Sequence, residues 1–139
     1  MVQKVHEVMT RAPVTVDRQA NLADAARMMR DRDIGDLIVM DNDRLYGVLT
    51  DRDIVVRAAA DARDLKSTAV DDVCSKDIVD IGLNDDADQA VMLMRARSVR
   101  RIPVTDGGKL VGVVALSDMA VEREDRSALA GISTAQPNR

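Results

Sequence analysis

Apolar and polar residues follow the same order twice along this chain. Each copy has a short β-branched run, then apolar residues at helical spacing, then two apolar runs around a turn. The copies align without a gap at an offset of 65 residues, so that Val8 falls on Val73 and Met29 on Met94. An internal repeat of this kind sets the architecture before any single element is considered.

Two copies are too few for an open solenoid. We therefore expect them to close on each other with pseudo-two-fold symmetry, residues 8–56 superposing on 73–121. The predicted division is 1–64 for the first repeat, 65–125 for the second and 126–139 for a flexible tail rich in Ser, Ala and Gly. An interface between two such copies is a natural place for a ligand.

The first copy predicts a strand over 14–16, a helix over 21–32, a hairpin formed by 37–40 and 45–50, and a helix from 51 to about 60. The second predicts a helix with Ala87, Ala90, Val91 and Met94 on its apolar face, a hairpin formed by 102–105 and 110–115, and a helix from 116 to about 124. Short helices over 5–9 and 69–74 are expected to lead into the first and second copy, respectively, and polar residues 61–68 to join them. The fold class is therefore α/β (α+β).

Composition narrows the function. Apolar residues make up 46% of the 139 residues, but Tyr46 is the only aromatic one, so the core and any base-binding wall must be aliphatic. A net charge of -4 argues against nucleic acid as the main partner. No apolar stretch is long enough to cross a membrane and no signal peptide opens the sequence, which predicts a cytoplasmic protein.

Single reactive residues argue against an enzyme. Cys74 has no second cysteine for an intrachain disulfide, and His6 has no second histidine for a Cys/His zinc site or a catalytic triad. The carboxylates lie in mixed-sign stretches that are typical of solvated helix faces. No nucleophile–base pair or metal cluster emerges from the sequence, so we expect a non-catalytic protein.

The sharpest local pattern is GVLTDRD, from Gly47 to Asp53, which follows a hairpin strand and opens a helix. One interpretation is structural: Thr50 caps the helix and Asp53 reaches back to it, while Gly47 allows a close approach of backbone or ligand. The other is functional: a hydroxyl and free amides bind phosphate, and a carboxylate accepts hydrogen bonds from ribose hydroxyls. The pattern alone leaves both open.

Together with SVRRIPV, from Ser98 to Val104, this motif closely resembles the cystathionine-β-synthase (CBS) domain. Two tandem copies resemble the paired module called a Bateman domain, over roughly residues 5–121 of the chain. The chain is thus similar to stand-alone CBS pairs of the small bacterial hypoxic-response type. The resemblance implies two β-α-β-β-α copies, adenosine-containing ligands in clefts between them, and disc-shaped homodimers.

The match to the family is uneven. Thr50 and Asp53 match its phosphate and ribose positions, and Asp118 matches the ribose aspartate of the second copy. Ala115 stands where the family has Thr or Ser, and the nearby Ser117 is out of register. The second site therefore lacks its usual hydroxyl.

The second copy keeps what the first lacks. Arg100 and Arg101 match the family's basic pair, where the first copy has Gly35 and Asp36. We predict one composite site, in which an arginine binds phosphate through two hydrogen bonds opposite Thr50 and Asp53. The alternative is that the two arginines form ion pairs at the surface or at an interface. Ile38 replaces the family's usual Pro. The predicted adenine walls are Val14, Val16, Leu37 and Ile38.

These observations predict a regulatory module that binds an adenine nucleotide (AMP, ADP or ATP) as a ligand, needs no other cofactor, and signals to an unknown protein partner. The alternative is a structural or interaction CBS pair that has lost nucleotide binding, favoured by Ala115 and Asp36. The apolar residues Ile54, Val55, Val56, Ala58, Ala59 and Ala60 also predict a homodimer interface.

Overall fold

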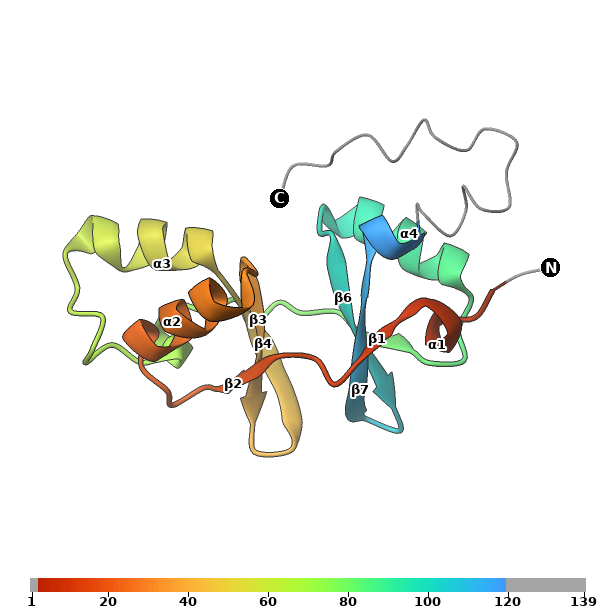
Figure 1. Ribbon diagram of the computed structural model, residues 1–139, viewed down its shortest axis with the longest axis horizontal. Helices are drawn as coiled ribbons and strands as arrows, with labels where there is room; N and C mark the ends of the chain where they lie inside the picture. Colours follow the sequence, from red (N-terminus) through yellow and green to blue (C-terminus); the bar gives the residue numbers. More distant parts are fainter. Residues whose placement is uncertain (1–2, 120–139) are drawn as a thin grey trace. The chain divides into compact units, whose positions relative to one another are not determined.

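The computed structural model describes residues 3–119, which form two compact units (Figure 1). The central unit is Val14–Ile78. The split unit consists, among the described residues, of 3–13 together with 79–119. The chain therefore passes between the units at Pro13–Val14 and again at Ile78–Val79.

The central unit contains β2 (Thr15–Asp17), α2 (Leu22–Arg32), β3 (Asp36–Asp41), β4 (Arg44–Thr50), α3 (Asp51–Arg57) and the 3-10 turns η1 (Ala59–Asp61) and η2 (Val70–Asp72). Its sheet has the order β2-β3-β4, with β2 parallel and β4 antiparallel to β3. Asn21 starts α2 because its side-chain oxygen accepts the amide of Asp24. Asp33 ends the helix in the left-handed conformation.

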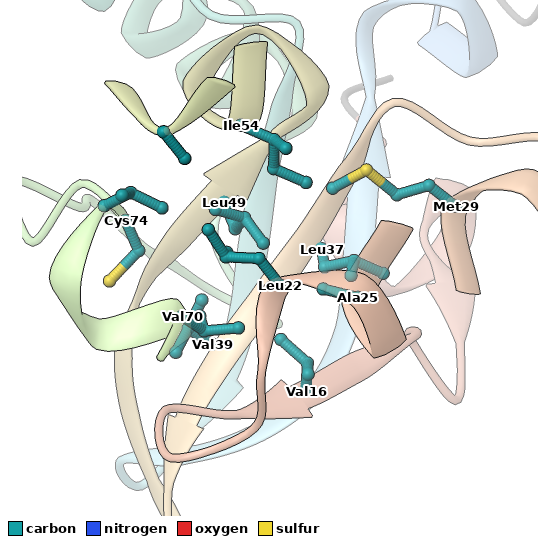
Figure 2. Close-up of a cluster of buried hydrophobic side chains, with 12 residues drawn as sticks. Val16, Leu22, Ala25, Met29, Leu37, Val39, Leu49, Ile54, Val70 and Cys74 are labelled. Atoms are coloured by element: carbon teal, nitrogen blue, oxygen red, sulfur yellow. The ribbon is translucent and has the colours of Figure 1, made fainter. Parts of the chain in front are cut away.

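Aliphatic side chains of α2 pack against the sheet, as the absence of Phe and Trp requires (Figure 2). Leu22 and Ala25 face Leu37 and Leu49, and all four are buried. Val70 and Val73, from the segment that includes η2, complete this core.

The split unit contains α1 (Val5–Val8), β1 (Thr10–Arg11), β5 (Ile81–Gly82), α4 (Ala87–Arg97), β6 (Arg101–Asp106) and β7 (Lys109–Ala115). Its sheet has the order β1-β7-β6-β5. Both hairpins shift register at the same place, between Val39 and Met40 and between Val104 and Thr105. The predicted order of strand, helix and hairpin is thus confirmed in both units, and the fold is α+β.

Several element limits differ from the prediction. The α3 helix ends at Arg57 and continues as η1. Residues 116–119 are helical, and the rest of the predicted helix, like the predicted tail, lies outside the described residues. No helix among the described residues is long and apolar enough to cross a membrane.

The short leading segments differ from the expectation in where they pack. We call 5–11 and 70–76 the leading segments. Residues 5–11 belong to the split unit and 70–76 to the central unit, so each packs with the copy that it does not precede. Residues 61–68, expected to join the copies, also lie within the central unit. Backbone hydrogen bonds join each segment to its unit: Val70 donates to Ala20, and Val5 donates to Asp85. The sequence limits 1–64 and 65–125 and the pseudo-two-fold packing stay predictions.

Candidate functional site

The GVLTDRD motif lies where β4 passes into α3. Thr50 is the N-cap of α3: its Oγ1 accepts the amide of Asp53 at 3.0 Å, and Asp53 Oδ2 accepts the amide of Thr50 at 3.0 Å. The structural interpretation of the motif, a capping box, is therefore observed. It holds the two predicted ligand-binding side chains in fixed positions relative to each other.

Capping leaves both side chains with bonding capacity. A hydroxyl that accepts one hydrogen bond still carries its own hydrogen, and a carboxylate has about four acceptor positions. Asp53 is 15% exposed, and its Oδ1 lies 3.7 Å from Nε of Arg57. The same pair is thus chemically able to cap the helix and to bind a phosphate and a ribose.

Packing against a neighbouring backbone explains why position 47 is glycine. A Cβ at this position would collide with the carbonyl oxygen of Ser75, because Val48 and Ser75 exchange two backbone hydrogen bonds of 2.9 Å. The close approach allowed by Gly47 is therefore that of another backbone. Gly112 repeats this in the split unit, where a Cβ would lie 2.7 Å from the carbonyl oxygen of Thr10.

The predicted adenine walls occupy different environments. Val16 and Leu37 are buried in the aliphatic core of the central unit, and Val14 is half-buried against it. Ile38 is also buried, but it alternates with Leu37 and Val39 and lies on the other face of the sheet. Its backbone amide bonds the carbonyl of Val14 at 3.3 Å. Val14 and Ile38 are therefore the better candidates of the four.

The corresponding positions of the split unit are Ala115 and Asp118. Ala115 ends β7, and Asp118 and Ser117 are exposed on the helical residues that follow. Arg100 and Arg101 are exposed at the start of β6, where the Arg100 carbonyl accepts the amide of Leu116 at 2.8 Å. The basic pair and Asp118 therefore lie close in their own unit.

Strand register explains why the two copies complement each other. In the central unit, Asp36 stands opposite Thr50 across the hairpin. At the same register in the split unit, Arg101 stands opposite Ala115. The acidic Asp36 thus lies opposite the residue with the hydroxyl, Thr50, and the basic Arg101 lies opposite Ala115, which has no hydroxyl.

The apolar stretch after the motif is only partly exposed. Val55 and Val56 are 61% and 48% exposed, and Ala59 and Ala60 are exposed as well. The side chains of Ile54 and Ala58 instead face the core of the central unit. These two residues therefore do not belong to a surface patch as predicted, because they lie on the inner face of α3.

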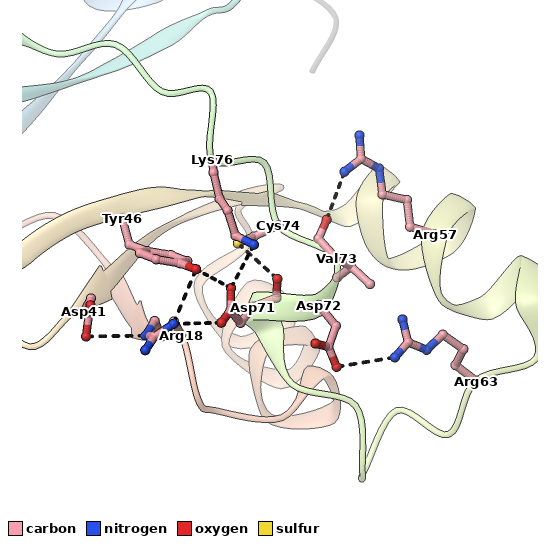
Figure 3. A network of polar contacts seen from close by, with 10 residues as sticks. All are labelled: Arg18, Asp41, Tyr46, Arg57, Arg63, Asp71, Asp72, Val73, Cys74 and Lys76. Atoms are coloured by element: carbon pink, nitrogen blue, oxygen red, sulfur yellow. Dashed lines mark hydrogen bonds and ion pairs between the residues drawn. The ribbon is translucent and has the colours of Figure 1, made fainter.

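Sequence reasoning missed a polar network around Asp71 (Figure 3). Asp71 accepts the Tyr46 hydroxyl at 2.6 Å, Nη1 of Arg18 at 2.9 Å and Nζ of Lys76 at 3.2 Å. Arg18 and Lys76 also approach the Tyr46 ring, at 5.0 and 5.7 Å from its centroid. Nε of Arg18 pairs with Asp41 at 3.4 Å.

This network fixes the leading segment 70–76 to the central sheet. The hydrogen bond from Tyr46, together with Lys76 and Arg18, lowers the pKa of Asp71 below its ordinary value. Asp71 in turn raises the pKa of Lys76. The sequence does contain one sign of this network, because Tyr46, the single aromatic residue, directly precedes Gly47 of the motif.

The described part of the chain shows neither an activated thiol nor a metal-binding cluster. Burial raises the pKa of the Cys74 thiol, which disfavours the reactive thiolate. Within residues 3–119, no three His, Cys, Asp or Glu side chains gather to hold a metal ion.

Comparison with known proteins connects this geometry to a family. The profile of the CBS domain matches residues 5–59 and 70–124. The CBS domain-containing protein YhcV of Bacillus subtilis is 36% identical over 136 residues, which cover 95% of this chain and 96% of YhcV. Hypoxic response protein 1 of Mycobacterium tuberculosis is 35% identical over 82% of this chain and 80% of its own length.

Solved structures agree with this assignment. A crystal structure of Hypoxic Response Protein I with two coordinated zinc ions has a TM-score of 0.78 at 33% identity, covering 85% of this chain and 97% of that one. The CBS domain pair of protein MJ0100, solved in complex with 5'-methylthioadenosine and S-adenosyl-L-methionine, has a TM-score of 0.78 at 18% identity over 91% of this chain and all of that one. At that identity, the second likeness shows the fold alone.

Proposed function

Because the chain belongs to the CBS-domain family and carries two copies of the domain, we propose that it is a regulatory module that binds an adenine nucleotide. The observation that carries this proposal is the fixed pair of Thr50 and Asp53, whose remaining donor and acceptor positions suit a phosphate and a ribose. The MJ0100 pair, complexed with two adenosine compounds, gives a precedent within the fold.

In this proposal the ligand lies in a cleft between the two repeats. Thr50 donates to a phosphate, Asp53 accepts from the ribose, and Arg100 or Arg101 of the split unit neutralises phosphate charge. Val14 and Ile38 lie against the adenine. Asp118 has the smaller role, because the hydroxyl that accompanies it in the family is replaced by Ala115. No cofactor beyond the nucleotide is required.

Thermal shift with a panel of AMP, ADP, ATP, NAD and S-adenosylmethionine tests this proposal. A ligand at 100 times its dissociation constant stabilises the folded state by about 2.7 kcal/mol. At this chain length, that corresponds to a rise in melting temperature of roughly 10 °C. If no adenine ligand raises the melting temperature, the binding proposal is wrong.

Replacing Arg100 and Arg101 together with Ala tests the phosphate contact. We expect several times more loss of affinity for AMP or ATP than for adenosine, and the difference should decrease with salt because the contact is between charges. Calorimetric titration measures both ligands. An equal loss for adenosine and AMP would show that the arginines shape the fold or pocket instead.

We further propose a cytoplasmic homodimer that has no catalytic activity of its own and signals to a protein partner. The exposed Val55 and Val56 support an interface on α3. Light scattering at tens of micromolar measures the mass, and a monomer mass would contradict the dimer. A structural CBS pair without nucleotide remains the second candidate, favoured by Ala115 and by Asp36 opposite Thr50.

A further inference from the structure

Residues 3–11 occupy a site on the split unit that is formed by residues 79–119. Backbone groups at both ends of the segment are bound: Val5 donates to Asp85 at 2.8 Å, His6 donates to Leu83 at 3.0 Å, and the Gln3 carbonyl accepts Ala87 at 2.8 Å. Further along, β1 adds an edge strand to β7, with Thr10 opposite Val113. The site therefore recognises main chain in a fixed register.

Apolar side chains of the segment also hold it in place. Val5 is completely buried in the core of the split unit, with Val8 and Met9 packed against the same core. Gly112 admits the segment, since a Cβ there would lie 2.7 Å from the Thr10 carbonyl oxygen and 2.8 Å from the Met9 sulfur. One fully buried valine side chain and one close backbone approach make the site selective for this segment.

The segment is not continuous in sequence with the rest of its unit. It leaves at Pro13, and the unit resumes only at Val79, after the whole central unit. At this junction Ala12 has φ 55°, a left-handed conformation that strains a residue with a Cβ. Within its own unit, residues 3–11 are held by non-covalent contacts alone.

The equivalent segment of the central unit is held more firmly. Residues 70–76 continue directly from residues of the same unit, and Asp71 binds Tyr46, Arg18 and Lys76. At the positions equivalent to Tyr46 and Arg18, the split unit has Val111 and Leu83, whose side chains form no hydrogen bonds. The ion pair between Lys4 and Asp86 is exposed and contributes little.

We propose that residues 3–11 form a docking segment that leaves and re-enters its site as one piece, and that this site accepts the same segment from a second copy of the chain. Exchange of an identical element between protomers is a low-cost route to association. The proposal is independent of nucleotide binding, and its tests contain no nucleotide.

The first test is hydrogen exchange on the full chain. The amides of Val5 and His6 should exchange at least about tenfold faster than those of Val70 and Asp71, which occupy the equivalent backbone positions. Equal or slower exchange of Val5 and His6 would overturn the proposal. This comparison needs no substitution.

The second test uses a variant that lacks residues 1–13 and a synthetic peptide of residues 1–13. The peptide should bind saturably, raise the melting temperature and restore amide protection within 79–119, and the same peptide with Val5→Asp should not. If the shortened variant does not fold, the full chain with Val5→Asp takes its place. Failure of the native peptide to rescue either protein, or rescue confined to residues 14–78, would overturn the proposal.

Discussion

The two leading segments have the same backbone contacts but different anchors. Val70 donates to Ala20 and Val5 donates to Asp85, which are equivalent positions in the repeat. Segment 70–76 then pairs with β4, which ends at Thr50, and segment 5–11 pairs with β7, which ends at Ala115. In the central unit, Asp71 adds a network of charged and aromatic groups. In the split unit, the residue equivalent to Asp71 is His6, and Val111 and Leu83 stand at the positions equivalent to Tyr46 and Arg18.

This difference shows how a repeat can keep a backbone scheme while its side chains diverge. Main-chain bonds and one buried valine define where each segment lies. The polar network then determines how firmly it is held, because hydrogen bonds to charged groups contribute more than neutral ones. The firmly held segment lies beside the strand that ends in Thr50, and Arg57 of the motif helix also bonds the Val73 carbonyl at 3.3 Å.

We expect the largest loss of stability from placing a Cβ at Gly47 or Gly112, where strands β4 and β7 contact the leading segments. Gly47→Ala should destabilise the protein by about 3 kcal/mol, because the Ser75 carbonyl is held in place and a collision forces the core to shift. Gly112→Ala should cost about 1 kcal/mol, since segment 3–11 is able to move away. Urea unfolding measures both. Equal losses would remove the distinction between a firmly and a loosely held segment.

Tyr46→Phe tests the network by removing only the hydroxyl bonded to Asp71. We expect a loss of about 1–2 kcal/mol in the free energy of unfolding, since the acceptor is charged. A double-mutant cycle with Asp71→Asn should give a non-additive result, because the two side chains are in contact. Additive losses would mean that the contact contributes no stability.

Acid should weaken the central unit through Asp71. Its pKa is lowered in the folded protein, so its stabilising effect is fully present above the ordinary value of 3.8 and is lost as the pH falls through the lower folded value. The stability difference between the wild type and Asp71→Asn should therefore be constant near neutral pH and shrink as the pH falls below 3.8. Unfolding curves at several pH values measure this, and a constant difference would contradict the assignment.

The smallest effect is expected at the ion pair of the split unit. Lys4 and Asp86 have side chains 47% and 39% exposed, so Lys4→Ala should change the free energy of unfolding less than any of the substitutions above. The same unfolding experiment measures it. A loss as large as that of Tyr46→Phe would show that the split unit holds its segment electrostatically after all.

Much of the fold was predictable because each copy repeats its hydrophobic periods and turn residues. Helix 21–32 and both hairpins follow from that pattern, and the capping box from the spacing of Thr50 and Asp53. The exchange of leading segments was not predictable, because the offset of 65 aligns Val5 with Val70 without saying which core either valine enters. The Asp71 network was missed for a similar reason: Arg18, Tyr46 and Asp71 are far apart in sequence and meet only in the folded unit. The ligand roles of the nine predicted site residues stay predictions.

Calorimetric titration of AMP into the wild type, Asp53→Asn and Asp118→Asn tests whether Asp53 binds the nucleotide. Asn at position 53 keeps an oxygen to accept the Thr50 amide, so the capping box persists while the carboxylate for the ribose is lost. Asn21→Ala, which removes the cap of α2, controls for general destabilisation. We expect one AMP per chain in the wild type, Asp118→Asn and Asn21→Ala, and no binding in Asp53→Asn. Binding that survives in Asp53→Asn but disappears in Asp118→Asn would contradict this expectation.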